Sequence, residues 1–582
     1  MTRDLYKEYV NPFKELELSD GNKIVNTAFG WIYEKEFKAI EDLSLSNNCY
    51  DNIKIESKHI KKLFFQNHNI WILPDSIINL SELEQINLVN CSLNAKKVTK
   101  LSELKKLEYL NLSNDFLSDY PEPINDLINL KHLILNKNYL GSIPDNISSL
   151  INLEELNLRD NKLICLPNSI SDLTALKILD ISSNVKLKIP ETITNLNSLI
   201  ELNIGYNDYK RLPAVITKIS SLQKLLIQSN GLKLIPKKIN KLKKLKWLDV
   251  SYNELSILPD ELSELADLEV INLSGNKFNG LPEQVFKLKK LNKLHAYACG
   301  LKNLSSDIGQ LKALEELNVH NNGIARLPET IGQLSCLKIL DLSENYLDCL
   351  PESFCDLKSL QTLNIKGYNH YQPTEYKGLT SLPSNLGDLT ELNYFDASCN
   401  KLKRIPDSIG FLIKLKNLRL NNNNISYLPE TINKLKSLEE LDLSHNNIIK
   451  LPDNFKELSN CNLSINLSYN ELTELPKDFK ELGYLCSLNL SHNQLHSLPL
   501  NFFDIGLKSF DLSYNQIREL PDNIKSSLFI KSIELNNNQL TSLPRSFENL
   551  TNLEYLDLRN NPLNQEEMYN IKAWFPNCKI VF

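Results

Sequence analysis

Two glycines, Gly275 and Gly280, have the spacing of a phosphate-binding loop. In such a loop the second glycine is followed by a lysine and then a serine or threonine, which contact the phosphates and a magnesium ion. Here Leu281 and Pro282 occupy those two positions, and neither side chain can make these contacts. We therefore interpret the stretch as a turn and predict no nucleotide cofactor.

The histidines and cysteines also lack the partners that metal binding or nucleophilic catalysis requires. His492 and His496 are four residues apart, but they lie on either side of an expected turn and have no acidic ligand beside them. Cys91 and Cys299 occupy turn positions, where a catalytic thiol would need a histidine that the pattern does not place. We predict no catalytic residue, no metal site and no cofactor, and we expect the protein not to be an enzyme.

The composition argues against several other functional classes. The chain has 582 residues, a net charge of -6 and a hydrophobic share of 42%, so its balance gives no reason to expect nucleic acid as a partner. The N-terminal residues carry scattered charges, unlike a signal peptide, and no apolar run is long enough for a transmembrane segment. The 11 cysteines are dispersed and form no CxxC pair, as expected of free thiols in a reducing compartment. We therefore expect a cytoplasmic protein.

A repeated unit must position these residues, and residues 153–176 (LEELNLRDNKLICLPNSISDLTAL) show it clearly. Leu156 and Leu158 alternate with polar residues, which predicts a short strand that is buried on one face. Asn161 follows at a turn, where its side-chain amide can bond backbone groups that a sharp corner leaves without partners. Pro167 begins the return path, which has room for about one turn of helix or 3₁₀ helix before the next unit.

The turn position recurs through most of the chain, and from Asp115 to Tyr368 every step is 23 residues. We align 23 repeats from Phe37 onward. Their turn residues are Asn48, His68, Cys91, Asp115, Asn138, Asn161, Asn184, Asn207, Asn230, Asn253, Asn276, Cys299, Asn322, Asn345, Tyr368, Asn400, Asn423, Asn446, Asn470, Asn493, Asn515, Asn538 and Asn561. A fixed period of this length predicts one long solenoid, because each repeat buries its apolar face only against its neighbours.

The pattern LxxLxLxxNxLxxLPxxIxxL, seen in residues 245–265 as LKWLDVSYNELSILPDELSEL, resembles the leucine-rich repeat in its 23-residue, LP-containing class. The chain is similar to Ras-scaffold, plant intracellular Ras-group and bacterial cytoplasmic leucine-rich repeat proteins over roughly residues 37–582. The resemblance implies an α/β fold class: a solenoid, curved as a horseshoe or a superhelix, with a parallel β-sheet on its concave face and short helical, 3₁₀ or irregular segments on its convex face.

We expect three parts in this chain. Residues 1–36 form an N-terminal cap, residues 37–563 form the solenoid, and residues 564–582 form a C-terminal cap, because an uncovered end would expose apolar surface. Asn564 followed by Glu567 predicts a capping box at the start of a short helix. A final short strand should then close the sheet.

The candidate binding residues are aromatic side chains on the predicted concave face. Positions six, four, two and one residue before the turn residue should be exposed there, and most hold Asn, Asp or Ser, as at Ser468 and Ser491. Trp247 should face solvent, and Ser274 and Gly275 should leave a depression on the same face. Exposed aromatic rings beside small residues are typical of binding hot spots. The predicted partner-binding residues are Tyr206, Trp247, Tyr252, His295, Tyr297 and His320. The depression should lie between Tyr252 and Tyr297. The alternative is that the rings only stack on one another along the sheet.

An insertion provides a second candidate contact. The step from Tyr368 to Asn400 is nine residues longer than usual, and the extra residues lie in Asn369 to Gly378. We expect this loop to project from one rim, and loops that interrupt repeats often carry function. The predicted partner-binding residues in and near it are Tyr371, Tyr376 and Tyr394. The alternative is a neutral insertion.

A lysine-rich band runs from Lys237 to Lys246 and continues at Lys287 to Lys290, with acidic residues between the two parts. Because these residues lie mostly on return segments, we interpret the band as a solvated convex face. An acidic partner or a membrane headgroup surface is the alternative.

These observations predict a non-enzymatic, cytoplasmic scaffold, a monomer that binds a protein partner on its concave face in intracellular signalling or regulation. The family resemblance implies this mode of action. The alternatives are a bacterial effector-type repeat protein that acts on host proteins, and a regulatory subunit of a phosphatase or small GTPase. The sequence does not name the partner.

Overall fold

The computed structural model describes residues 10–17, 23–27, 30–44, 53–68, 70, 72–368, 377–458, 462–477, 479–524 and 530–582. The chain divides into two compact units, Met1–Asn276 and Lys277–Phe582. We call them the N-terminal unit and the C-terminal unit, and each is a stack of similar repeats.

The N-terminal unit begins with an antiparallel sheet of β1 (Val10–Glu17), β2 (Lys23–Thr27) and β3 (Gly30–Tyr33), followed by helix α2 (Glu34–Ser44). The sequence analysis placed the first repeat at Phe37, whereas the structure has α2 there. Ala39, Ile40 and Leu43 are buried, and their spacing lies on one face of a helix. The turn residue expected for that repeat, Asn48, lies outside the described residues.

Helix α2 is attached to the first strands of the main sheet through a buried carboxylate. β4 (Ile53–Glu56) pairs antiparallel with β5 (His59–Gln66). Glu36 is fully buried, and its carboxylate accepts hydrogen bonds from the backbone N–H of Ile60 at 2.8 Å and contacts His59 Nδ1 at 2.7 Å. A buried carboxylate needs such partners, so this contact fixes α2 against β5.

From β5 onward the strands of the N-terminal unit are parallel and follow one another in chain order. They are β6 (Gln85–Val89), β7 (Tyr109–Asn111), β8 (His132–Ile134), β9 (Glu155–Asn157), β10 (Ile178–Asp180), β11 (Glu201–Asn203), β12 (Lys224–Leu226), β13 (Trp247–Asp249) and β14 (Val270–Asn272). Equivalent residues pair in register, for example Leu225 with Leu248.

The C-terminal unit repeats this arrangement with parallel strands that also follow chain order. They are β15 (Lys293–His295), β16 (Glu316–Asn318), β17 (Ile339–Asp341), β18 (Thr362–Asn364), β19 (Tyr394–Asp396), β20 (Asn417–Arg419), β21 (Glu440–Asp442), β22 (Leu463–Asn466), β23 (Tyr484–Asn489), β24 (Gly506–Asp511), β25 (Ser532–Glu534), β26 (Tyr555–Asp557) and β27 (Lys579–Val581).

Short 3₁₀ helices, labelled η, connect the strands. In the N-terminal unit they are η1 (Asp75–Asn79), η2 (Ala95–Lys97), η3 (Thr99–Glu103), η4 (Glu122–Asp126), η5 (Asp145–Ser149), η6 (Asn168–Asp172), η7 (Glu191–Asn195), η8 (Ile216–Lys218), η9 (Lys237–Lys241) and η10 (Asp260–Glu264). In the C-terminal unit a one-turn helix, α3 (Glu283–Phe286), is followed by η11 (Ser306–Gln310), η12 (Glu329–Gln333), η13 (Glu352–Asp356), η14 (Leu386–Asp388), η15 (Asp407–Phe411), η16 (Glu430–Lys434), η17 (Asp453–Glu457), η18 (Phe479–Leu482), η19 (Phe502–Asp504) and η20 (Arg545–Asn549).

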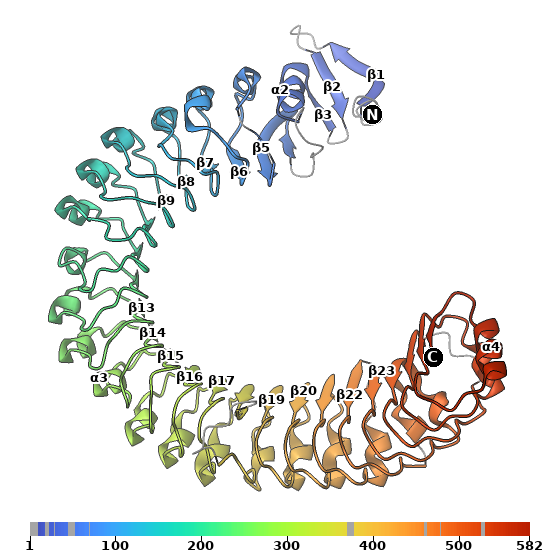
Figure 1. Ribbon diagram of the computed structural model, residues 1–582. Coiled ribbons are helices and arrows are strands. Elements are labelled where there is room, and N and C mark those ends of the chain that lie inside the picture. The colour runs from blue at the N-terminus through green and yellow to red at the C-terminus, as the bar shows by residue number, and fades with distance from the viewer. Residues whose placement is uncertain are drawn as a thin grey trace. The chain divides into compact units, whose positions relative to one another are not determined.

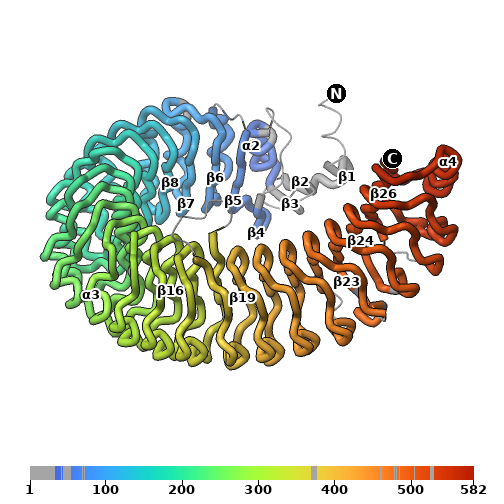
Figure 2. The backbone as a smooth tube through the Cα atoms, turned by 60° about the horizontal axis from the view of Figure 1, so that its bottom comes forward, coloured from blue at the N-terminus to red at the C-terminus, as the bar shows by residue number. Residues whose placement is uncertain are grey.

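Within each unit the strands line the inner side of the stack and the 3₁₀ helices lie on the outer side (Figure 1). The tube view shows the same repeats following one another in each unit (Figure 2). The expected parallel sheet on the concave face and the short 3₁₀ segments on the convex face are confirmed. Repeat leucines such as Leu245, Leu248 and Leu262 are at most 1% exposed, so the core lies between the two layers.

A ladder of buried asparagines joins each repeat to the one before it, and Asn253 is typical. Its Oδ1 accepts hydrogen bonds from the backbone N–H groups of Asn230 and Leu232, at 3.0 and 2.9 Å. Its Nδ2 donates to the carbonyl oxygens of Ile227, at 3.1 Å, and Val250, at 2.9 Å. One side chain therefore satisfies backbone groups of two neighbouring repeats, as the sequence predicted for the turn position.

Asp115 occupies the same ladder position, but its carboxylate can only accept hydrogen bonds when it is ionised, whereas an asparagine amide also donates. One carboxylate oxygen accepts from the N–H groups of Cys91 and Leu93, but the other is buried and has no hydrogen-bond partner among the described residues. Burial raises the pKa of Asp115 from its ordinary 3.8 to about 6, because the hydrogen bonds that it accepts only partly offset the loss of water. Once protonated, the free oxygen gains a proton to donate, as Nδ2 does in asparagine.

The C-terminal cap forms largely as the sequence predicts. Helix α4 (Gln565–Trp574) begins after Asn564, whose side chain accepts a hydrogen bond from the N–H of Glu567. The other half of the expected capping box is absent, because the Glu567 carboxylate accepts instead from the N–H of Leu543 in the preceding repeat, at 3.0 Å. β27 then pairs with β26. The cap is therefore bonded directly to the stack.

We predict that Asn253→Ala lowers the free energy of unfolding by about 1 to 3 kcal/mol, because buried backbone groups lose their partners. Equilibrium denaturation should measure the loss, and hydrogen exchange should show faster exchange in the adjacent repeat. Glu254→Ala, an exposed neighbour, is the matched control and should change little. Equal stabilities of the two variants would contradict the role of the ladder.

We predict that Asp115→Asn stabilises the protein at alkaline pH by about 1 to 3 kcal/mol, because asparagine can donate at every pH. The folded-state pKa of Asp115 lies above its unfolded value, so ionised Asp115 destabilises the fold fully above about pH 6 and not at all below about pH 4. The advantage of the variant should therefore shrink as the pH falls through this window. Denaturation curves at a series of pH values measure it, and an advantage that is independent of pH would be inconsistent with an ionised Asp115.

Candidate functional site

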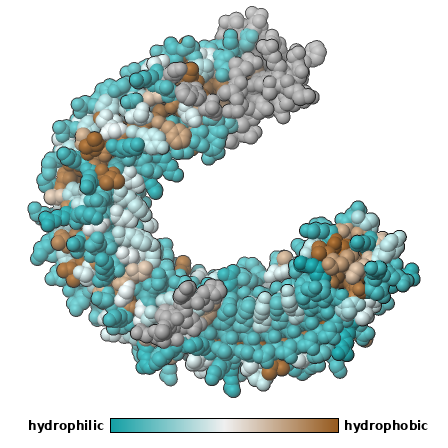
Figure 3. All heavy atoms as spheres, in the orientation of Figure 1, coloured by the Kyte–Doolittle hydropathy of each residue, from teal (hydrophilic) through white to brown (hydrophobic). Residues whose placement is uncertain are grey.

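Small polar residues cover the concave face of both units, and their hydrogen bonds fold them onto the strand ends. Asp249 Oδ1, for example, accepts from the N–H and the hydroxyl of Ser251, at 2.9 and 2.6 Å. In the space-filling view the visible surface of the C-terminal unit is mostly hydrophilic (Figure 3). The expected exposure of Ser468 and Ser491 is wrong: they are 5% and 4% exposed, because each hydroxyl turns back to donate to an asparagine two residues earlier.

In the N-terminal unit Trp247 stands out from this polar surface. Its side chain is 39% exposed at the start of β13, as the alternation of the strand predicted. The ammonium group of Lys224, on the neighbouring strand, lies 5.2 Å from the ring centroid and also pairs with Glu201 at 2.9 Å. The indole is therefore held on one side by a cation and remains accessible to a partner.

Tyr206 and Tyr252 are also exposed, but they lie at the turns that follow the strands. Both have left-handed backbone conformations, with φ of 60° and 53°. A Cβ placed on Gly275 would lie 2.7 Å from Cδ1 of Tyr252, so the tyrosine ring rests against this glycine and occupies the space that the sequence assigned to a depression. Gly275 itself has a φ of +66°, which also favours glycine.

In the C-terminal unit the three remaining candidates are held by neighbours. His295 Nε2 and Lys293 Nζ contact the Glu316 carboxylate at 2.9 and 2.8 Å, and these contacts outweigh burial and lower the pKa of Glu316. The Tyr297 and His320 rings stack, with centroids 4.6 Å apart and planes 12° apart. For Tyr297 and His320 the geometry matches the alternative to partner binding, in which the rings only stack on one another along the sheet.

The insertion after Tyr368 leaves the ladder intact. Asn400 Nδ2 donates to the carbonyl oxygen of Ile365, which is the same contact as elsewhere across a longer stretch of chain. Tyr371 and Tyr376 lie outside the described residues. Tyr394 is described: the guanidinium of Arg419 lies 5.6 Å from its ring centroid and forms two hydrogen bonds with the Glu440 carboxylate, at 2.8 and 3.0 Å.

The sequence analysis missed a continuous stack of four rings in the C-terminal unit: His445, Tyr469, His492 and Tyr514. Successive ring centroids are 4.1, 3.9 and 4.0 Å apart, and the planes lie within 11° of parallel. All four precede the ladder asparagine by one residue, so an aromatic residue at this position in four consecutive repeats was the available signal. Burial in the stack lowers the pKa of His492.

The cysteines and histidines that the sequence analysis singled out lie in structural positions. Cys91 and Cys299 are at most 1% exposed, and burial raises the pKa of the Cys91 thiol to about 12, so it stays protonated. Over the described part of the chain, no group of three histidine, cysteine or acidic side chains is placed to hold a metal ion. His492 belongs to the ring stack rather than to a pair with His496.

Three of the six lysines in residues 237–246, the part of the band in the N-terminal unit, form ion pairs with acidic neighbours. Lys237 pairs with Glu261, Lys243 with Glu264 and Lys246 with Glu269, at 3.3, 2.9 and 3.2 Å. These exposed pairs fit the interpretation of a solvated convex face. No helix among the described residues is long and apolar enough to span a bilayer.

Models of leucine-rich repeat families match much of the chain. A leucine-rich repeat region matches residues 117–233 and 229–322, and a leucine rich repeat model matches residues 312–370, 390–448 and 505–563. A further leucine rich repeat model matches residues 552–577. These models do not distinguish the 23-residue class, which stays a prediction.

Solved structures of similar fold include bacterial, plant and Drosophila proteins. The leucine-rich repeat protein LIC12759 of Leptospira interrogans is 28% identical, with a TM-score of 0.50 over 84% of this chain and 99% of that chain. A TDR receptor is 25% identical, with a TM-score of 0.57 over 84% and 91%. The ectodomain of the Arabidopsis receptor kinase HAESA, in complex with an extended IDA peptide hormone, is 25% identical, with a TM-score of 0.56 over 94% and 95%.

A comparison with curated protein sequences found no match. The family assignment therefore rests on the repeat models, the solved structures and the fold. Each regular repeat contributes one parallel strand, one ladder position and one return segment, and the matched models cover repeats in both units. The chain belongs to the leucine-rich repeat proteins.

Proposed function

We propose that this protein is a non-enzymatic scaffold that binds a protein partner on its concave face. The observation that carries the proposal is Trp247, a large aromatic side chain that is 39% exposed on the concave sheet face. Such rings anchor many protein interfaces. The complex of HAESA with a peptide hormone supports binding by this fold, although it does not identify a partner for this chain.

The partner-binding residues that we propose remain those of the sequence analysis: Tyr206, Trp247, Tyr252, His295, Tyr297, His320, Tyr371, Tyr376 and Tyr394. Trp247 and Tyr252 have the strongest support, because both rings are exposed and each is oriented by a neighbouring residue. The stacked pair of Tyr297 and His320 has weaker support, since each ring already covers one face of the other.

We place this scaffold in the cytoplasm, as a monomer in intracellular signalling or regulation. Cys165, Cys336 and Cys349 are exposed free thiols, which suit a reducing compartment better than an oxidising one. The competing location is extracellular, where receptor ectodomains of this fold act. A bacterial effector-type protein and a regulatory subunit of a phosphatase or small GTPase are the competing roles.

The test begins with a pull-down from the native cell, with the captured protein identified by mass spectrometry and its affinity then measured with purified components. We predict that Trp247→Ala weakens that affinity by about 2 kcal/mol or more, the scale of a central hot spot. The melting temperature should barely change, because the ring lies outside the core.

Ile339→Ala is the matched control. Ile339 begins β17 in the C-terminal unit at the equivalent position, and its side chain is 40% exposed. This variant should keep both affinity and melting temperature. If Trp247→Ala binds the partner as the unmodified protein does, the proposed contact is refuted, and a marked fall in its melting temperature would show that the indole is structural.

A further inference from the structure

Three neighbouring strands of the C-terminal unit carry a carboxylate at the same position of the concave face. Asp511 ends β24, Glu534 ends β25 and Asp557 ends β26, and these residues pair directly in the parallel register. Adjacent strands are only about 4.8 Å apart, so the three negative charges lie close together. Like charges at this spacing are unfavourable unless cations compensate them.

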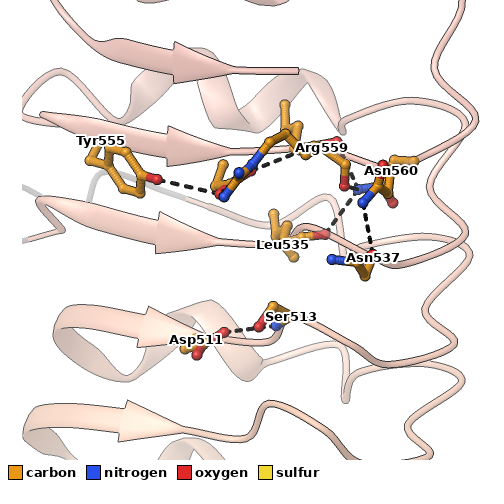
Figure 4. Close-up of polar contacts among 10 residues, drawn as sticks. Asp511, Ser513, Leu535, Asn537, Tyr555, Arg559 and Asn560 are labelled. Atoms are coloured by element: carbon orange, nitrogen blue, oxygen red, sulfur yellow. Dashed lines mark hydrogen bonds and ion pairs between the residues drawn. The ribbon is translucent and has the colours of Figure 1, made fainter.

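Only one of the three carboxylates has a cation partner among the described residues. Asp557 is 1% exposed and binds the guanidinium of Arg559, and it also accepts a hydrogen bond from the Tyr555 hydroxyl at 3.3 Å (Figure 4). The next cation along the sheet, Lys579, lies over the Tyr555 ring, 5.7 Å from its centroid. The local charge is therefore incompletely neutralised.

Asp511 and Glu534 carry the remaining charge. Asp511 Oδ1 accepts a hydrogen bond from the N–H of Ser513, a neutral donor (Figure 4). The Glu534 carboxylate makes no hydrogen bond or ion pair with any residue that the structure describes. Burial raises the pKa of Glu534, the nearby Asp511 and Asp557 raise it further, and the Arg559 guanidinium offsets only part of this effect. A bound cation would reverse the effect of these two neighbours.

A second, independent feature is the amide of Asn536. This residue is 7% exposed, yet its Oδ1 has no hydrogen-bond partner in the described structure. Leu535 is fully buried in the core, so Asn536 shares the concave side with Glu534, two residues before it. A buried acceptor without a donor is costly in the free protein. It lies beside two carboxylates that form no direct ion pair with a described residue and feel Arg559 and His492 only from a distance. This arrangement points to a ligand that is both cationic and a hydrogen-bond donor.

Small side chains precede the two carboxylates on the same face. Ser509, two residues before Asp511, pairs in register with Ser532, two residues before Glu534. Tyr514, the last ring of the four-ring stack, borders the site, because its N–H donates to the Asn536 carbonyl oxygen at 2.9 Å. On the third strand Ser532 pairs in register with Tyr555, so small side chains adjoin the carboxylates on β24 and β25 and rings lie on both sides of them.

We propose that Asp511, Glu534 and Asn536 bind the guanidinium group of an arginine in a basic segment of the protein partner. This inference rests on the proposed scaffold function and names the chemistry that the scaffold recognises. A guanidinium offers five N–H donors in one plane and so can serve two carboxylates and an amide oxygen together. A metal ion fits less well, since no three acidic, histidine or cysteine side chains in the described structure are placed to hold one.

The probe is a fluorescein-labelled peptide with three arginines separated by Gly-Ser pairs, titrated with the full-length protein at low salt and followed by fluorescence anisotropy. A peptide with citrulline in place of arginine removes the charge and keeps the shape. We expect the citrulline peptide to bind at least about tenfold more weakly. Equal binding of the two peptides would overturn the proposal, and so would a calcium ion that binds calorimetrically in a Glu534-dependent manner.

Variants of the protein then locate the contact. The double variant Asp511→Asn, Glu534→Gln should weaken binding of the arginine peptide by about tenfold or more. The matched control is Asp341→Asn, because Asp341 occupies the same position on β17 but pairs in register with Asn318 and Asn364 rather than with acids. An equal loss in the control would mean general charge attraction and would refute the site.

Melting temperatures separate binding from folding. Glu534→Gln removes a repelled carboxylate, so it should melt no earlier than the unmodified protein while losing affinity. If a captured partner binds this variant normally, the site is wrong and the scaffold function stands. If no partner is captured while the arginine peptide still binds in a Glu534-dependent manner, the site stands and the scaffold function loses its support.

Discussion

The buried asparagine at each turn is the interaction on which the rest of the structure depends. Its amide oxygen accepts from backbone donors of the preceding repeat, and its amide nitrogen donates to carbonyl groups of both repeats, as at Asn230 and Asn253. A tight corner in a buried sheet edge leaves these groups without partners, and water cannot reach them. The ladder therefore turns the chain and joins neighbouring repeats with the same atoms.

This constraint also determines what the concave face can present. The residue before the ladder asparagine has a left-handed backbone, as at Tyr206, Tyr252 and Tyr469, and its side chain is directed in the same way from repeat to repeat. Rings at this position in consecutive repeats stack, whereas a ring on a strand such as Trp247 stays accessible. A rigid, repeated backbone holds its surface side chains in fixed positions, which suits the binding of a partner better than catalysis.

The proposed binding features lie in different units and rely on different interactions. Trp247 offers apolar area between Lys224 and Val270 of the neighbouring strands. The face of β24 to β26 offers negative charge and an unsatisfied acceptor in place of apolar area. Each unit holds its own side chains in place without help from a ligand.

The sequence by itself determined the repeat, the parallel sheet, the ladder position and the C-terminal cap, because each depends on residue periods and local hydrogen bonding that neighbours along the chain can reveal. It also placed Trp247 at the surface by simple alternation. The tertiary structure alone decided the rest. Helix α2 replaces the expected first repeat because it packs against η1 and its buried Glu36 carboxylate bonds β5. Ser468 and Ser491 turn inward because their hydroxyls bond nearby asparagines. The four-ring stack and the row of Asp511, Glu534 and Asp557 arise between residues about one repeat apart, and such contacts depend on the register of the strands, which only the folded sheet supplies.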